Sequence, residues 1–269
     1  MDFQSKNFNI KGLKMRSIKN ILYISMLILL SSTGVLSAVE QNKEIKTTHP
    51  VASVILMDAY IYLGSLDYFS FDAITTNDDV FRDLMLKEYT HMIHVDMLRP
   101  NKLQMHISGD IKNRSTYIFN DSFTIIDHEL NYYGELQVPK TIDIALDHLY
   151  EKFNIKSPLA NLLYTDLAKR IAPKDNGYYF GTTRIDGKVC HYIGFVNDQR
   201  ELQVWIEKGK TPLIRKFSII DKSGKFDLRS TTLLRWDIKP YFKRKHFQFK
   251  APRDAVKISI EVADTKGAL

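Results

Sequence analysis

The single cysteine and the eight histidines are the residues of this sequence with the widest range of chemistry, and Cys190 and His191 are adjacent. A thiol beside an imidazole is the pairing of a cysteine nucleophile with its base. Both residues fall in a predicted strand, where neighbouring side chains point to opposite faces and cannot hydrogen-bond to each other. The pattern therefore favours a structural cysteine. A hydrolase stays open as an alternative until the histidines are placed in space.

The other histidines do not form a recognisable metal site. His91 and His94 lie in a predicted strand, where a spacing of three residues puts them on opposite faces. His128 and Glu129 fall in a predicted turn, with no cluster of further ligands nearby. The sequence has no phosphate-binding glycine loop, nucleophile elbow or zinc signature. We therefore predict no catalytic residue, no metal and no cofactor.

The net charge of +7 is concentrated at the start of the chain. Residues 1–37 carry five lysines or arginines against one acid, so about +3 remains for the rest, which is ordinary for a domain that does not bind nucleic acid. The basic run Lys243–His246 could contact anionic head groups, but its shortness favours a solvated turn. We predict no nucleic-acid partner.

The first 38 residues have the order of a secretory signal peptide. A basic region ends at Lys19, an apolar run covers residues 21–30, and small residues continue to Ser37 or Ala38. The run is shorter than the roughly 20 residues of a membrane span, which disfavours the alternative of an uncleaved anchor. Met15 could be the true start. We expect a periplasmic mature chain with no disulfide, no lipid anchor and no stable membrane span.

Most of the remaining chain predicts antiparallel strands. The segment 188–220 forms three strands joined by tight turns, and further strands are expected at 87–98, 102–108, 116–119, 123–126, 178–185 and 226–238. In one strand Leu202, Val204 and Ile206 alternate with a more polar face. In the next, Phe217 shares a face with Arg215, a charge that needs a partner. The charge of Arg215 could be balanced by an internal salt bridge, solvated by water if the side chain extends to the edge of the sheet, or paired with an acidic group of a ligand.

Helices are predicted in two places, before the first strand and between the strands. Residues 50–64 predict an amphipathic first helix with the apolar stripe Val51, Val54, Ile55, Ala59, Tyr62 and Leu63. Thr141 is placed to cap a helix over 142–153 whose stripe includes Leu146 and Leu149, and Ser157 with Pro158 predicts another helix before Pro173. We therefore predict an α+β fold, a curved antiparallel sheet or incomplete barrel covered by amphipathic helices, as one domain over residues 39–269.

Several motifs carry a resemblance to a known family. They are Arg99-Pro100-Asn101-Lys102, Ser157–Leu163 (SPLANLL), Cys190–Phe195 (CHYIGF), Gln203–Gly209 (QVWIEKG), Pro212–Lys216 (PLIRK) and Pro252–Ala255 (PRDA). As a set they resemble the predicted periplasmic proteins of domain of unknown function 2092, over nearly all of the chain beyond residue 38. The sequence departs from that pattern at Leu202 and Ile214, where an aromatic residue and a proline are usual.

That family is similar to the periplasmic lipoprotein carriers, whose fold is a half-barrel of antiparallel strands plugged by helices. The resemblance implies this fold and a periplasmic location, and it brings no reaction. The apolar faces then become candidates for a ligand site, although core packing would give the same pattern. The candidate ligand-binding residues are Met105, Ile107, Leu146, Leu149, Val204, Ile206, Arg215, Phe217 and Trp236.

We therefore expect a soluble, non-enzymatic periplasmic protein that binds or carries a hydrophobic small molecule or lipid. The helix at 142–153 would form part of the lid, and Arg215 would hold the polar end of the ligand. The alternative from another class is an envelope sensor or scaffold that binds a protein partner.

Overall fold

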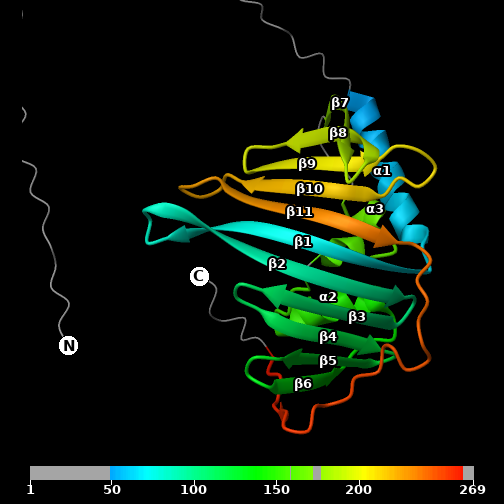
Figure 1. Cartoon of the computed structure of the whole chain (residues 1–269), viewed down its shortest axis with the longest axis vertical. Helices are drawn as coiled ribbons and strands as arrows, with labels where there is room; N and C mark the ends of the chain where they lie inside the picture. The colour runs from blue at the N-terminus through cyan, green and yellow to red at the C-terminus, as the bar shows by residue number, and fades with distance from the viewer. Residues whose placement is uncertain (1–48, 158, 172–176, 263–269) are drawn as a thin grey trace, which may run out of the picture. The chain divides into compact units, whose positions relative to one another are not determined.

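The structure is a computed structural model that describes residues 49–157, 159–171 and 177–262. The chain divides into two units, Met1–Glu44 and Ile45–Leu269, and the first lies outside the described residues. The signal peptide expected at 1–38 lies outside them too. The described residues form one large antiparallel sheet with helices against one face (Figure 1).

The sheet has twelve strands. In chain order they are β1 (Tyr68–Phe81), β2 (Met85–Leu98), β3 (Lys102–Gly109), β4 (Asn113–Phe119), β5 (Ser122–Asp127), β6 (Tyr132–Gln137), β7 (Gly177–Ile185), β8 (Lys188–Val196), β9 (Arg200–Glu207), β10 (Ile214–Asp221), β11 (Leu228–Asp237) and β12 (Val256–Lys257). Their order across the sheet is β12-β6-β5-β4-β3-β2-β1-β11-β10-β9-β8-β7, and only the short β12 is parallel to its neighbour.

This order explains where the helices lie. Strands β1–β6 run outward to one edge, and β7–β11 begin at the opposite edge and return until β11 pairs with β1. The connection from β6 to β7, which we call the crossing segment, must therefore cross the sheet. It contains α2 (Ile142–Phe153), the short 3-10 helix η1 (Ala160–Leu162) and α3 (Leu167–Arg170). We call the face that this connection covers the inner face, and the opposite one the outer face. The expected open, curved sheet covered by helices is confirmed.

The first helix, α1 (His49–Ser65), also lies on the inner face and packs against β7 and α3 (Figure 1). Its predicted stripe is confirmed at Ala59 and Leu63, which are buried, and is wrong at Val54, which is 55% exposed. The other buried side chains are Ala52, Leu56 and Tyr60. The helix is apolar on nearly every side, so periodicity alone could not choose its buried face.

Gly64 lies in the last turn of α1, where it permits a close approach. A Cβ at Gly64 would lie 2.2 Å from the carbonyl oxygen of Thr165, a distance that real Cβ atoms do not reach. The last turn of α1 therefore rests directly on the backbone between η1 and α3.

The helix predicted to start at Ser157 is also wrong, apart from its two short pieces η1 and α3. Leu159 adopts a left-handed conformation with φ 56°, which interrupts the expected helix. The carbonyl groups of Leu163 and Tyr164, which a continuous helix would use internally, accept hydrogen bonds from Arg99. Tertiary contacts have replaced helical hydrogen bonds in this segment. Pro158 lies outside the described residues.

Arg99, at the end of β2, joins three parts of the fold with one guanidinium group. Its Nη1 donates hydrogen bonds to the carbonyl oxygens of Leu63, at 3.2 Å, and Leu66 at the end of α1. Its Nη2 donates to the carbonyl oxygens of Leu163, at 3.0 Å, and Tyr164, at 3.3 Å. Burial lowers the pKa of Arg99. The planar fork of an arginine suits this task because it presents several donors in fixed directions.

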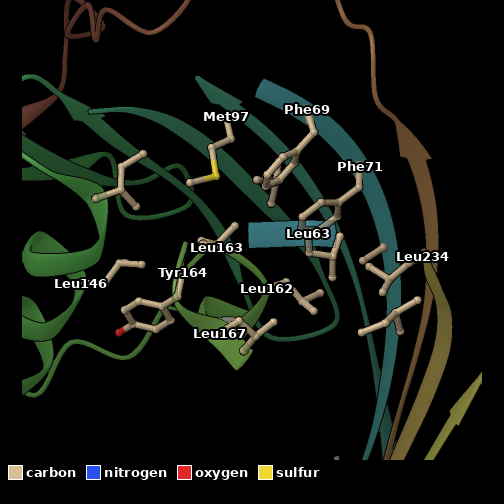
Figure 2. Close-up of a cluster of buried hydrophobic side chains, with 14 of the residues drawn as sticks. Leu63, Phe69, Phe71, Met97, Leu146, Leu162, Leu163, Tyr164, Leu167 and Leu234 are labelled. Atoms are coloured by element: carbon tan, nitrogen blue, oxygen red, sulfur yellow. The ribbon is translucent and has the colours of Figure 1, made fainter. Parts of the chain in front are cut away.

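The core beneath Arg99 is formed by side chains from the sheet and from α1, α2, η1 and α3 (Figure 2). Phe69, Phe71 and Met97 extend from the strands toward Leu162, Leu163 and Leu167 of the crossing segment. Leu146 of α2 meets the same cluster from another side. The predicted helix 142–153 and its buried Leu146 and Leu149 are confirmed as structural elements.

The chain after β11 crosses the outer face. Phe247 is buried there, and Phe249 packs between Tyr117 and Tyr133 with ring centroids 5.4 Å and 5.3 Å away. His246 Nε2 lies 2.7 Å from Asp96 Oδ2, so the basic run predicted as a turn ends in a contact with the sheet. The C-terminal segment thereby covers Asp96 on the outer face of β2.

Asp96 and His94 form a charged pair under this segment. The hydrogen bond to Asp96 raises the pKa of His94 to about 9, against the effect of burial, and a second bond to Asp72 adds to it. Burial alone would raise the pKa of Asp96, but hydrogen bonds from His94, Ser70 and His246 lower it to about 2. Both groups are therefore charged across neutral pH.

Replacing Arg99 by methionine should lower the free energy of unfolding by about 2–4 kcal/mol, because buried carbonyl groups lose a charged donor. Arg99→Lys should recover only part of this, since an ammonium group cannot reach the same four acceptors. Urea unfolding measures the change. Arg235→Met is the control, because Arg235 is exposed and its ion pair with Asp186 should contribute little to stability. Equal losses in the Arg99 and Arg235 variants would contradict this role.

The His94–Asp96 pair predicts a pH dependence of stability. The folded-state pKa of His94 is raised, so its contribution is fully present below the unfolded value of about 6.5 and is lost as the pH rises through about 9. The urea midpoint of the wild type should therefore fall across this interval, and His94→Gln should flatten the decline. An identical slope in both proteins would rule the pair out as its source.

Candidate functional site

A cavity of about 690 Å³ lies between the inner face of the sheet and its helical cover. Its wall on the sheet side comes from β1, β2, β3, β9, β10 and β11, and its cover comes from α1, η1, α3 and the residues beside them. The volume falls within the roughly 300–1,000 Å³ of typical small-molecule sites. This is the candidate functional site.

One part of the cavity is apolar. The side chains of this part are Ile93, Ile107, Leu159, Leu162, Leu167, Ile171, Leu202, Val204, Ile214, Phe217 and Ile219. Leu162 and Leu167 belong to the crossing segment and also join the core cluster of Figure 2. Tyr60 lines the cavity from α1, and burial raises the pKa of its hydroxyl to about 12. A tyrosine in this setting stays neutral.

Two rows of polar side chains cross the inner face at one end of the cavity. Strand register aligns Tyr89, Asn77 and Ser230 in one row, and His91, Thr75 and Thr232 in the next. Ser230 Oγ donates to Asn77 Oδ1 at 2.7 Å, and the hydroxyls of Thr75 and Thr232 are 2.9 Å apart. The third row is apolar, with Ile93, Ala73 and Leu234. The inner face therefore changes from polar to apolar within three rows.

The polar rows lie where the cavity opens. Ile111, Lys112, Asn161 and Ile219 line the cavity and are exposed to solvent. Ile219 is paired with Ser230 of the first polar row. Ile111 and Lys112 belong to the loop that follows Gly109, the partner of His91. These exposed residues form the mouth.

His91 is a buried polar group of the cavity wall that has no hydrogen-bond partner on its Nε2 among the described residues. Burial lowers the pKa of His91, and the positive charge of Lys112 lowers it further. The imidazole is therefore neutral at physiological pH. Lys112 is the only formally charged side chain among the described residues that line the cavity.

Three of the nine sequence-predicted ligand-binding residues line this cavity: Ile107, Val204 and Phe217. Met105, Ile206 and Trp236 face the same side but belong to the packed core, where Trp236 Nε1 donates to the carbonyl oxygen of Ile214 at 2.8 Å. Leu146 and Leu149 are also core residues. The prediction selected the correct face and could not separate core from cavity, because both are apolar.

Arg215 lies away from the cavity, contrary to its predicted place beside Phe217. The pairing of β10 with β9 shifts between Ile214 and Lys216, and this bulge turns Arg215 toward the face that carries Glu207. Arg215 Nε donates to Glu207 Oε2 at 2.9 Å. The internal salt bridge that the sequence left open is therefore the arrangement observed. A bulge cannot be read from alternation, which assumes a constant period of two.

The helix α2 does not act as the lid of this cavity. None of the described lining residues belongs to Ile142–Phe153. Its acidic side instead binds the later part of the same connection, since Asp147 accepts a hydrogen bond from Tyr164 Oη at 2.9 Å and pairs with Arg170 at 3.0 Å. The cover over the cavity is formed by α1 and by residues 157, 159–162, 167 and 171.

The polar rows were missed at the sequence level, although β1 carries a signal of them. Its inward positions are Phe69, Phe71 and Ala73, followed at the same spacing by Thr75 and Asn77. A buried face that turns polar partway along a strand is a mark of a site. Their partners in β11, Thr232 and Ser230, are more than 150 positions away in the sequence. No local sequence pattern could have predicted that these residues pair.

Cys190 and His191 do not form a catalytic pair. The Cys190 thiol is buried and donates to the carbonyl oxygen of Lys188 at 3.6 Å, and burial raises its pKa. His191 Nδ1 lies 3.1 Å from Tyr179 Oη. Within the described part of the chain, no three Cys, His, Asp or Glu side chains gather as metal ligands. No described helix is long and apolar enough to cross a membrane.

The strands β1 and β2 extend beyond their neighbours as a hairpin (Figure 1). Pairing of β1 with β11 stops at Asn77 and pairing of β2 with β3 stops at His91, so residues 78–90 pair only with each other. Large apolar side chains are exposed at the tip: Phe81, Leu84, Met85 and Leu86, with Leu84 at 78%. The hairpin stands beside the mouth, since Asn77 and Tyr89 at its base line the cavity.

Comparisons with known proteins identify the family to which the chain belongs. The family described as "Predicted periplasmic protein (DUF2092)" matches residues 52–261. No curated protein sequence matches the chain.

Among solved structures, Mycobacterium tuberculosis lipoprotein LppX is similar at 14% identity, covering 72% of this chain and 98% of that chain with a TM-score of 0.45. LprF from Mycobacterium bovis is similar at 14% identity, covering 77% and 98% with a TM-score of 0.44. A LolA superfamily protein from Nitrosomonas europaea is similar at 9% identity, covering 72% and 96% with a TM-score of 0.31.

Proposed function

The chain belongs to the DUF2092 family of predicted periplasmic proteins, and from that premise we propose that it is a soluble periplasmic protein that binds or carries a hydrophobic ligand, a lipid or an acyl chain. The observation that carries the proposal is the cavity of about 690 Å³ with apolar walls on both the sheet and the cover. A packed core of the same residues would leave no such space.

The driving force for binding would be the burial of alkyl surface. Each methylene group moved from water into the cavity contributes about 0.8 kcal/mol. Part of that gain is offset by the loss of motion of the bound ligand. The rigid wall of strands and the segment held by Arg99 keep the further cost of ordering the protein small, because the site is formed before the ligand arrives.

The proposal is of a binding protein and not of an enzyme. A cysteine hydrolase would need its thiol within hydrogen-bond reach of a base. The Cys190 thiol donates to the backbone instead, and its raised pKa disfavours the reactive thiolate.

We also propose that residues 1–38 are a cleaved signal peptide and that residues 39–269 are one mature half-barrel domain. The support is the order of basic, apolar and small residues in this segment. The intact mass of protein from the envelope fraction should correspond to a chain that begins at Ala38 or Val39. A membrane-bound form that keeps Met1 or Met15 would contradict the proposal.

A second candidate function is supported by the β1–β2 hairpin. Its exposed Phe81, Leu84, Met85 and Leu86 would suit a non-enzymatic envelope sensor or scaffold that binds a protein partner. Under that function the cavity would have no role, so changes in its wall would leave the biological activity unaltered.

Val204→Phe is the test of the proposed function, because Val204 lines the cavity from β9. The larger ring should occupy ligand space and weaken binding of a fluorescent fatty acid at least about tenfold. The free energy of unfolding should change by less than about 1.5 kcal/mol, since the added volume enters a cavity and not a filled core. Titration of the probe and urea unfolding measure the two quantities.

Leu149→Ala is the matched control, because Leu149 is buried in the core outside the cavity. It should lower the free energy of unfolding by about 2–5 kcal/mol and leave the affinity of the folded protein unchanged. Full probe affinity in Val204→Phe, or no probe binding by the wild type, would overturn the carrier function in favour of the scaffold.

A further inference from the structure

The cavity is amphipathic, and this property limits what it can hold. Its deeper walls are apolar, whereas Asn77, Thr75, Thr232 and Ser230 present hydroxyl and amide groups near the mouth. Each of these groups uses only part of its hydrogen-bonding capacity within its pair, so a ligand that is apolar throughout would bury their remaining donors and acceptors, which is unfavourable. The match is better for a ligand with one polar and one apolar end.

The positive charge of Lys112 at the mouth determines which kind of head group the cavity favours. Lys112 is exposed in the loop between β3 and β4, and it is the only charged side chain among the described residues of the lining. The nearby Asp110 carboxylate is not among the lining residues, and it accepts a hydrogen bond from the backbone N–H of Thr90 at 2.7 Å. A cationic head group would be repelled by Lys112, and an anionic one attracted.

His91 supplies a second polar contact beside Lys112. Its Nε2 is buried without a partner, which is costly unless a bound group satisfies it. With its proton on Nε2, the neutral ring donates a hydrogen bond to an oxygen of a carboxylate or phosphate. The same oxygen-rich group that Lys112 attracts would therefore satisfy His91.

The volume limits the number of chains. At roughly 30 Å³ per non-hydrogen atom, the volume of a water molecule in the liquid, 690 Å³ accommodates about 20 such atoms. Palmitate has 18, and a phospholipid with two such chains has more than twice as many. The cavity is large enough for one chain and a small head group.

Resting on the function proposed above, we propose that the cavity takes a single-chain amphiphile with an acidic head group. The head group lies at the mouth, between Lys112 and the polar rows that contain His91. The tail extends inward along Val204 and Phe217 of the sheet, under Leu162 and Leu167 of the crossing segment. A free fatty acid and a single-chain phosphate share this chemistry.

Competition against a neutral fluorescent probe tests the proposal. N-phenyl-1-naphthylamine is bound to the full mature protein, and it is displaced by palmitate, hexadecyl phosphate, hexadecanol or hexadecyltrimethylammonium, each below its critical micelle concentration. Palmitate or hexadecyl phosphate should displace the probe at about fivefold lower concentration than hexadecanol, and the ammonium compound should be weakest. The difference between palmitate and hexadecyl phosphate identifies which acid the mouth prefers.

Lys112→Gln should remove the preference for acids and leave the affinity for hexadecanol unchanged. Lys210→Gln is the control, since Lys210 is an exposed lysine that does not line the cavity. Hexadecanol equal to palmitate in the wild type, or a Lys112→Gln variant that keeps the preference for acids, would overturn the inference and leave the carrier function standing. Displacement by dioleoylphosphatidylglycerol as effective as by palmitate would overturn its single-chain part. Failure of the probe and of every amphiphile to bind would overturn the proposed function itself.

Discussion

An open sheet with one apolar face can exist in water only if that face is covered, and this constraint organises the structure. The two meanders meet at β1 and β11, so the chain must cross from β6 at one edge to β7 at the other. The crossing segment is the natural cover, and α1 completes it. Arg99 holds both in place by donating hydrogen bonds to carbonyl groups of α1 and of the crossing segment.

The cover is too small to fill the space that the sheet encloses. The crossing segment has one helix of three turns and two short helical pieces. After α2 its backbone is held by side chains, since Arg99 donates to the carbonyl oxygen of Tyr164 and Asp143 accepts a hydrogen bond from the backbone N–H of Thr165. The side chains of α2 complete the core on one side of the segment. On the other side the shorter η1 and α3 leave the cavity. The short segment that covers the sheet therefore also leaves the cavity.

The sequence predicted the parts of the fold that depend on local patterns. Hairpins, strand alternation and α2 were found because each is encoded within about ten residues, and Val204 and Phe217 were assigned to the correct face for that reason. The bulge that turns Arg215 outward and the register that aligns Thr75 with Thr232 are long-range features. The buried face of α1 was predicted only in part, because an almost wholly apolar helix carries little periodic signal. Core and cavity residues differ only in what surrounds them, which no sequence pattern records.

We propose that the inner face of the sheet encloses a hydrophobic ligand, and native mass spectrometry of the mature protein isolated from its own periplasm is the decisive experiment. One bound molecule of an alkyl-chain compound per protein is expected, and it should be lost on denaturation. The fraction of protein that carries it should fall strongly when Val204 is replaced by phenylalanine. A ligand-free mass for the wild-type protein, under conditions that preserve its fold, would show that the inner face holds no ligand.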